Sequence, residues 1–330
     1  MEKIIVQGRK NGKQIEIACS NLVMGAGDFL RADNMDFAGP VLDQYFEMGG
    51  NIFDTARHYR HSEKAIGTWM KVRGNRDSVI IQTKGGHPVR EASDVPRVTA
   101  EAIHEDISVS LDTLQTDHVE LFALHRDNPE VEVGEIMEAM HQEVEDGRVY
   151  AIGLSNWELP RIIEANEYAV SHGLTPLSFN SPNFSLAKVN RPRWENCVSA
   201  NEAMIHWHEK TGLPLFSWSS QAGGFFSGRF SKEDRSDTEM VEVYYSEANW
   251  ERFSRAKQLA KQKGCTPIQI SLAYVLTQSF PTAAVIGPEN AAELKSSVLA
   301  AEITLTQAEV DWLDLKAQGK AERKWIFKLK

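Results

Sequence analysis

Short apolar runs recur along the chain and alternate with stretches in which apolar residues return at helical spacing. Eight runs are almost continuously apolar, which is typical of parallel strands covered on both faces; they fall at 22–26, 51–54, 79–84, 119–125, 151–155, 177–180, 215–219 and 283–287. Helical periodicity predicts helices near 38–48, 61–73, 103–114, 136–144, 158–172, 196–211, 247–263 and 291–301. Eight strands that alternate with eight helices predict an α/β fold, a closed (β/α)8 TIM barrel rather than an open doubly wound sheet.

Further segments lie on either side of this repeat. Two β-prone runs flank Asn11-Gly12, a pair that supplies the two positive-φ residues of a type I′ turn, so we expect a hairpin over 3–19. The barrel itself covers about 22–301, and a C-terminal helix with a basic tail follows over 302–330. No linker rich in Pro, Gly or Ser interrupts the series, which predicts one domain over 1–330.

The longest connection, 223–247, follows the seventh predicted strand. A connection of this length in a compact barrel is usually functional or disordered. Its aromatic residues favour a loop that folds over another part of the molecule, as a strap or a lid; they are Phe225, Phe226, Phe230, Tyr244 and Tyr245.

Charge and cysteine content narrow the classes of partner and location. The chain of 330 residues has 36 Lys and Arg against 46 Asp and Glu, a net charge of −10, which argues against a nucleic-acid or anionic-membrane partner. Three distant cysteines without a C-x-x-C spacing indicate reduced thiols rather than disulfides or a zinc site. No apolar run approaches the ~18 residues that cross a bilayer. We therefore expect a cytoplasmic protein; nothing in the pattern assigns an oligomeric state.

Four residues with chemical potential fall at or just beyond the ends of consecutive predicted strands. Asp54, Lys84 and His125 end three such strands, and Tyr59 lies five residues beyond Asp54. Each has an ordinary alternative, since an Asp can cap a turn, a Lys can be a solvated loop charge and a His can be a hydrogen-bonded wall residue. Because reactive groups of a barrel collect at the C-terminal strand ends, the coincidence of all four favours a catalytic site.

The four groups also suit one kind of reaction. A phenol has a reference pKa of ~10, and a neighbouring ammonium lowers it, while a carboxylate keeps that ammonium charged. Bringing Tyr59 to a pKa near 7 takes roughly three units, or about 4 kcal/mol, after which it is a matched general acid–base. His125 could bond and orient the substrate oxygen. The arrangement predicts protonation of a carbonyl oxygen while another group delivers hydride.

The chain resembles the aldo-keto reductase family in five segments: Asn51-Ile-Phe-Asp-Thr-Ala-Arg-His-Tyr59, Ser62-Glu-Lys-Ala-Ile-Gly67, Ile81-Gln-Thr-Lys84, Leu121-Phe-Ala-Leu-His125-Arg126 and Ala151-Ile-Gly-Leu-Ser155-Asn156. The resemblance runs from about Leu22 to the helix after Gly287. It implies a nicotinamide-dependent carbonyl reductase on a barrel with a hairpin that caps its bottom. It also implies that Asp54, Tyr59, Lys84 and His125 form the catalytic tetrad, with Tyr59 as proton donor.

The same resemblance implies a set of cofactor-binding residues. Ser155 and Asn156 match the pair that bonds the nicotinamide carboxamide, Ser181 stands where a glutamine is usual, and Trp218 takes the place of a tyrosine that stacks on the ring. The whole expected set is Gly27, Asp28, Ser155, Asn156, Ser181, Trp218, Ser219, Gln221, Gly223, Gly287, Glu289, Asn290 and Glu293. Gly27 and Asp28 fall, with Phe29, where a Gly-Thr-aromatic triplet is common, and the segment 221–224 resembles the strap over the pyrophosphate.

The choice between NADP and NAD depends on the last of these segments. Family members that prefer NADP usually carry Arg or Lys after the eighth strand, whereas this chain has Glu289 and Glu293 with Lys295. The spacing Asn290-x-x-Glu293 also fits a capping box, in which the carboxylate turns back onto the helix start. We expect NADP, with NAD as the alternative.

The sequence is also compatible with other functions on the same barrel. A redox-sensing regulatory subunit with little turnover would keep the same fold and tetrad. A retaining glycosidase needs two carboxylates roughly 5–5.5 Å apart, and a metal-dependent hydrolase needs a ligand cluster; the strand ends offer Asp28 as the one evident second acid and no such cluster. We expect no metal. A small-molecule carbonyl substrate would meet an apolar-walled pocket, with Phe29, Tyr59, His87, Trp157 and Phe184 as candidates, moderated by Arg31, Arg57 or Arg60.

Overall fold

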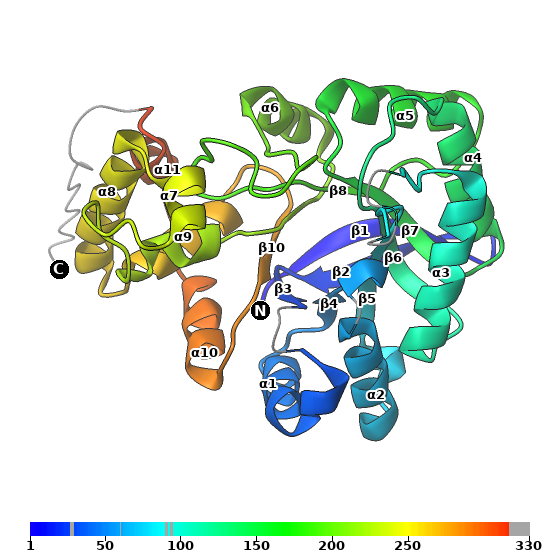
Figure 1. Ribbon diagram of the computed structural model, residues 1–330, viewed down its shortest axis with the longest axis horizontal. Helices are drawn as coiled ribbons and strands as arrows, with labels where there is room; N and C mark the ends of the chain where they lie inside the picture. Colours follow the sequence, from blue (N-terminus) through cyan, green and yellow to red (C-terminus); the bar gives the residue numbers. More distant parts are fainter. Residues whose placement is uncertain (27–29, 60, 90–91, 93–94, 317–330) are drawn as a thin grey trace, which may run out of the picture.

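A closed parallel barrel forms the centre of the molecule, in a computed structural model that describes residues 1–26, 30–59, 61–89, 92 and 95–316 (Figure 1). The strand order is β10-β3-β4-β5-β6-β7-β8-β9, and every neighbouring pair is parallel. The strands are β3 (Leu22–Gly25), β4 (Ile52–Asp54), β5 (Ile80–Gly85), β6 (Val119–Leu124), β7 (Val149–Ser155), β8 (Phe179–Ser181), β9 (Leu215–Ser217) and β10 (Thr282–Ile286). All eight predicted strands are confirmed, and so is the barrel.

Alternate residues of each strand belong to two separate buried clusters. One cluster includes Val23, Ile52, Ile80, Leu121 and Phe216, which fill the barrel interior. Their chain neighbours belong to the larger cluster between the barrel and its helices; examples are Met24, Phe53, Ile81 and Phe122. Because side chains alternate with a period of two, the inward series leads, at the C-terminal strand ends, to Asp54, Lys84, His125, Ser155, Ser181 and Trp218.

An N-terminal hairpin closes the opposite end of the barrel. It pairs β1 (Lys3–Lys10) with β2 (Lys13–Ser20) in antiparallel register. Asn11 and Gly12 have φ of 51° and 72°, as a type I′ turn requires. Val6, Ile17 and Cys19 of the hairpin are buried in the interior cluster, so the hairpin seals the barrel floor.

The helices surround the barrel and confirm most of the predicted series. They are α1 (Met35–Glu47), α2 (Ser62–Arg73), α3 (Ala100–Leu114), α4 (Val133–Glu145), α5 (Leu159–Ser171), α6 (Glu202–Thr211), α7 (Thr238–Tyr244), α8 (Glu247–Lys263), α9 (Pro267–Leu276), α10 (Ala291–Ala300) and α11 (Gln307–Leu313). Three differ from expectation: α6 begins at Glu202 rather than near 196, whereas α7 and α9 were not predicted. Short 3₁₀ turns are η1 (Ala32–Asn34), η2 (Arg57–Tyr59), η3 (Arg76–Ser78) and η5 (Ala222–Ser227).

The long connection after β9 is more ordered than a loop. It contains η5 and α7, and its Phe225 and Tyr244 are fully buried. Phe225 packs on Trp250 of α8 with ring centroids 4.7 Å apart, and the Tyr244 backbone oxygen at the end of α7 accepts from the Asn249 amide of α8 over 2.8 Å. Aromatics of this connection therefore pack on α8, as the sequence predicted for another part of the molecule. A role of the connection as a strap or a lid stays a prediction.

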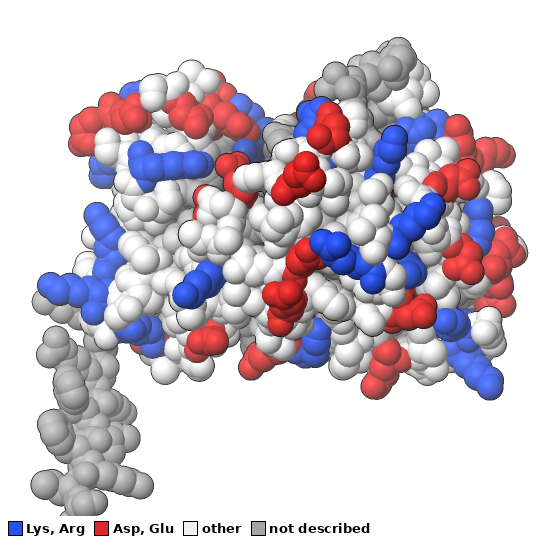
Figure 2. Space-filling model, turned by 90° about the horizontal axis from the view of Figure 1, so that it is seen from below, with Lys and Arg blue, Asp and Glu red and all other residues white. Residues whose placement is uncertain are grey.

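The surface carries charges of both signs. On the face shown in Figure 2, acidic and basic side chains are interspersed among neutral ones. Within the described residues, none of the helices has the length and apolar character that crossing a bilayer would require.

Candidate active site

A buried ion pair lies at the C-terminal ends of two adjacent strands. Lys84 Nζ donates to Asp54 Oδ1 over 2.5 Å and to the backbone oxygen of Thr55 over 3.1 Å. The two side chains are only 3% and 6% exposed. Since β4 and β5 are neighbours in the barrel and both residues point inward, the pair follows from strand order and side-chain alternation.

Tyr59 stands over this pair on the short turn η2. Its backbone N–H donates to the Ala56 oxygen, and the preceding Thr55 bonds the start of α2 through the Ser62 hydroxyl over 2.7 Å. The ammonium of Lys84 lies 5.5 Å from the centre of the Tyr59 ring. The His125 ring meets the same ring edge-on, with centroids 5.5 Å apart. The structure therefore brings together all four residues of the predicted tetrad.

The electrostatics of the tetrad confirm one expectation and correct another. Burial alone would lower the pKa of Lys84, but the charge of Asp54, with a smaller contribution from Tyr59, outweighs it and holds that pKa above its usual value, so the lysine stays charged as expected. The sequence predicted a Tyr59 pKa lowered towards neutrality. Instead, loss of water around the phenol raises the pKa of Tyr59, and the opposing charge of Lys84 does not fully offset this. Tyr59 is therefore a protonated donor at neutral pH.

A group of three imidazoles adjoins the tetrad. His58 of η2 stacks on His87, with centroids 3.8 Å apart and planes inclined by 7°. Both rings contact His125, at 4.7 Å and 5.3 Å. Burial, followed by the charge of Lys84, holds the pKa of His125 well below its usual value, and burial lowers the pKa of His58 to about 3. The three rings are neutral near pH 7, and His125 Nδ1 is buried with no hydrogen-bond partner in the described part of the chain.

Three of the expected nicotinamide contacts lie together at the C-terminal ends of β7 and β8. Ser155 Oγ donates to the Ser181 backbone oxygen over 2.7 Å. The Asn156 amide donates to the His125 oxygen over 3.2 Å, and its oxygen accepts from the Val198 N–H. The Ser155 and Asn156 side chains, which we expected to bond the nicotinamide carboxamide, are therefore already bonded to other parts of the protein. Ser181 Oγ, by contrast, is buried and has no partner among the described residues.

The turn after β9 brings Trp218, Ser219, Gln221 and Gly223 to the same end of the barrel. The Trp218 indole N–H is also buried without a described partner. Ser219, Ala222, Gly223 and Gly224 have positive φ values between 49° and 82°. Two arginines that sequence reasoning did not single out contact this turn: Arg229 donates to the Gly223 oxygen over 2.7 Å, and Arg193 approaches Ser219 Oγ at 3.4 Å.

The segment after β10 contains Gly287, Glu289 and Asn290 and leads into α10, whose first turn carries Glu293. Asn290 is the N-cap, and its side chain accepts from the Ala292 and Glu293 N–H groups. The Glu293 carboxylate accepts from the Glu289 N–H and from the Asn290 amide, each over 3.0 Å. The Glu293 carboxylate therefore turns back onto the start of the helix, in a way that resembles a capping box. Gly27, Asp28 and Phe29 lie outside the described residues.

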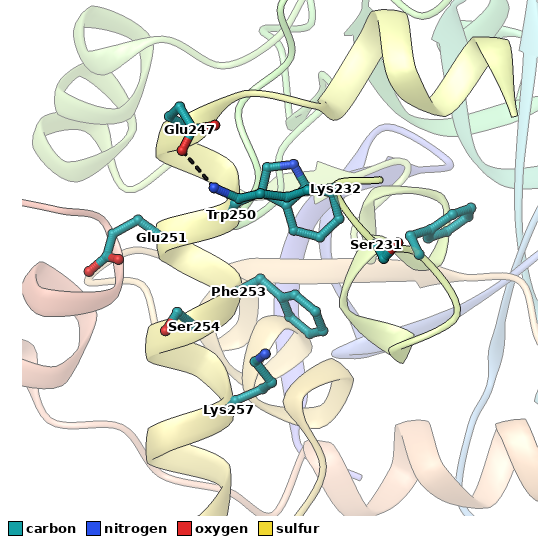
Figure 3. A pocket seen from close by; sticks show the side chains of 9 residues that line it. Ser231, Lys232, Glu247, Trp250, Glu251, Phe253, Ser254 and Lys257 are labelled. Carbon is teal, nitrogen blue, oxygen red and sulfur yellow. Dashed lines mark hydrogen bonds and ion pairs between the residues drawn. The ribbon is translucent and has the colours of Figure 1, made fainter. Parts of the chain in front are cut away.

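A separate hollow of about 490 Å³ lies beside α8, away from the tetrad. Figure 3 shows Trp250 and Phe253 pointing from α8 towards the loop that carries Ser231. An ion pair of 2.6 Å between Lys232 and Glu247 borders the hollow. None of its lining residues belongs to the tetrad or to the expected cofactor set, so it carries no part of the predicted chemistry.

The metal-dependent alternative gains no ligand set from the structure. Among the described residues, no group of three or more His, Cys, Asp or Glu side chains is placed to hold a metal ion. Asp54, the acid at the strand ends, has Lys84 as its partner rather than a second carboxylate. The geometry accordingly suits proton transfer from a phenol beside a lysine.

Comparisons with known proteins give a family match over most of the chain. A sequence model of the Aldo/keto reductase family matches residues 21–317. The chain is 26% identical to the norsolorinic acid reductase stcV of Emericella nidulans, covering 91% of this chain and 77% of that protein. It is 27% identical to an uncharacterized oxidoreductase of Bacillus subtilis, YrpG, covering 87% and 88%. It is also 27% identical to the aryl-alcohol dehydrogenase GME11368 of Pestalotiopsis microspora, covering 84% and 72%.

Proposed function

Because the chain belongs to the Aldo/keto reductase family, we propose that it is a nicotinamide-dependent oxidoreductase that reduces an aldehyde or ketone to an alcohol. The observation that carries the proposal is the buried Asp54–Lys84 ion pair directly beneath the Tyr59 ring, with neutral His125 beside it. A protonated phenol next to a fixed ammonium is a proton donor whose conjugate base is stabilised in place.

Each side chain then has a defined task. Tyr59 donates its proton to the carbonyl oxygen as hydride reaches the carbon. Lys84 stabilises the phenolate that remains, and Asp54 holds the ammonium charged and in position. His125, which is neutral, donates a hydrogen bond to the carbonyl oxygen and orients it. A nicotinamide cofactor, when bound, supplies the hydride.

The residues around the strand ends fit such a cofactor. Ser181 Oγ and the Trp218 N–H are buried polar groups without described partners, as expected of groups that bond a polar ligand. The Trp218 ring offers an aromatic face for stacking. Arg193 and Arg229, which contact the turn that resembles the pyrophosphate strap, bring positive charge to a diphosphate.

We propose NADP as the preferred cofactor, with NAD as the alternative. The positive end of the α10 dipole, at Asn290, favours a phosphate, and Lys295 adds one positive charge. Glu293 is bonded to Glu289 and Asn290, which reduces its power to repel a 2′-phosphate. The usual preference of the family for NADP supports the same cofactor.

Aromatic carbonyl compounds are the first substrates to examine. One relative is named an aryl-alcohol dehydrogenase, and the rings of His58 and His87 pack together beside Tyr59. Flat rings of this kind offer stacking surfaces to an aromatic ring.

The test is an assay of the purified protein with a panel of aliphatic and aromatic aldehydes and ketones, each with NADPH and with NADH. Oxidation of the reduced cofactor above the uncatalysed rate, with alcohol formed in equal amount, supports the proposal. Tight binding of the cofactor with no turnover on any carbonyl would contradict it, and would instead favour a redox-sensing subunit.

A further inference from the structure

We propose that Asp106, a buried carboxylate on α3, is a positioning residue that fixes the stacked His58–His87 pair against the tetrad. This inference rests on the proposed function and deepens it, because it assigns a further residue to the same site. Among the described residues, the hydrogen bonds and ion pairs of Asp106 lead to Gly86, Arg57 and Arg97 and to no tetrad residue, so Asp106 acts through the two loops that carry the imidazoles.

Asp106 ties together chain segments that are far apart in the sequence. It is 1% exposed. One carboxylate oxygen accepts the Gly86 N–H over 2.8 Å. The other lies 3.2 Å from Arg57 Nε and accepts from Arg97 Nη2 over 2.7 Å.

These attachments lie directly beside the two stacked rings. Arg57 precedes His58 on η2, the turn that also carries Tyr59. Gly86 precedes His87 in the segment that follows β5 and Lys84. Asp106 holds each loop at the residue that precedes its histidine. One carboxylate therefore sets the distance between two loops whose imidazoles meet at 3.8 Å.

The packing around Asp106 leaves little room for the loops to shift. A Cβ added at Gly85 would lie 2.9 Å from Asp106 Cβ and 2.8 Å from the Phe122 ring, so α3 approaches the end of β5 as closely as a glycine permits. The stacked pair in turn contacts His125 and Tyr59, with ring centroids 4.6 Å apart for His58 and Tyr59. If the carboxylate is lost and the stacked pair shifts, Tyr59 and His125 shift with it, and these are the two groups proposed to bond the carbonyl oxygen.

The first test compares Asp106→Asn with Glu143→Gln. Glu143 is a matched control because it is also a buried carboxylate paired with an arginine, Arg148. It belongs to α4 and bonds α3 through His104, away from the C-terminal strand ends where the tetrad lies. We expect kcat for aldehyde reduction to fall between about tenfold and a hundredfold in Asp106→Asn, as misplacement of reacting groups by about 1 Å can cause. We expect the cofactor Kd to stay within about twofold of the original in both variants.

A second pair of variants keeps the inference testable if Asp106→Asn does not fold. Arg57→Gln and Arg97→Gln each remove one guanidinium from the same carboxylate, but only Arg57 is carried by the turn with Tyr59. The inference predicts a fall in kcat for Arg57→Gln and a nearly unchanged kcat for Arg97→Gln. Equal effects of the two, or a kcat in Asp106→Asn that matches that of Glu143→Gln, would overturn it.

A measurement without turnover separates this inference from the proposed function. The imidazole C–H protons of His58 and His87 can be assigned by NMR, with His58→Gln and His87→Gln as references, and their shifts report ring stacking. We expect these shifts to move in Asp106→Asn and Arg57→Gln and to stay in Glu143→Gln and Arg97→Gln. Unmoved shifts in the first two variants would refute the positioning role, whether or not the protein reduces a carbonyl.

Discussion

Replacement of Lys84 by Met examines how the tetrad works in quantitative terms. The ammonium lies 5.5 Å from the Tyr59 ring centre. With the phenolate charge placed at that centre and an effective dielectric constant of about 20, its stabilisation by the ammonium is about 3 kcal/mol. Removing the ammonium should therefore raise the pKa of Tyr59 further above its usual value.

The effect on rate follows from the sign of this shift. Alcohol oxidation needs the phenolate as base, so its rate rises with pH through the pKa of Tyr59 and is lost below it. In Lys84→Met the midpoint of this profile should move to higher pH. If the proton is half transferred in the transition state, about half of the 3 kcal/mol is expressed there, and rates in both directions at a fixed pH below the midpoint should fall about tenfold.

The assay is the pH dependence of alcohol oxidation together with carbonyl reduction at one pH, and Lys188→Met is the matched control. Lys188 also lies over aromatic rings and pairs with an aspartate, Asp314, at 3.2 Å, but it is not at the tetrad. Its replacement should leave the midpoint in place. An unchanged midpoint and an unchanged rate in Lys84→Met would refute the reasoning. Unfolding should be followed in parallel, because Asp54 is left buried without its partner.

Three further perturbations test other parts of the account. Glu293→Arg replaces a carboxylate at the start of α10 with a cation, and the ratio of the NADPH and NADH KM values should move towards NADPH; an unmoved ratio would show that this helix start does not face the 2′-phosphate. Prolonged chelation should leave activity unchanged, since phenol-assisted hydride transfer needs no Lewis acid, and activity that is lost and then restored by zinc or magnesium would contradict the mechanism. Gly67→Ala would bring a Cβ within 2.6 Å of the Leu114 oxygen, so the free energy of unfolding should fall by about 1–3 kcal/mol, whereas Gly39→Ala, with 3.9 Å to its nearest neighbour, should cost nothing.

Local pattern was sufficient for most of the barrel. The eight apolar runs became its strands, and Asn11-Gly12 formed the turn of the hairpin. The helix α9 escaped prediction because its sequence, from Pro267 to Leu276, is apolar almost all round, and periodicity cannot distinguish a buried helix from a buried strand. The signals that could have found it are Pro267 at the first turn and the capping box of Thr266 and Gln269.

The same limits explain the outcome at the site. Asp54, Lys84 and His125 could be predicted as site residues because they end strands, where the reactive groups of a barrel lie. Asp106 lies in the middle of a helix, and its contacts with Arg57 and Gly86 exist only once the chain has folded. The direction of the Tyr59 pKa was missed because a sequence shows the neighbouring charge but not the loss of water that outweighs it.

The exchange of Tyr59 for Phe tests the central claim most directly, because it removes the phenol oxygen and keeps the ring that packs against His58 and His125. If Tyr59 is the proton donor, kcat/KM for carbonyl reduction should fall by about 10²–10⁴, the range for loss of general acid catalysis. The Kd of the reduced cofactor, measured by fluorescence titration, should remain close to that of the unaltered protein. A Tyr59→Phe protein that binds the cofactor and reduces the carbonyl at an undiminished rate would contradict the account.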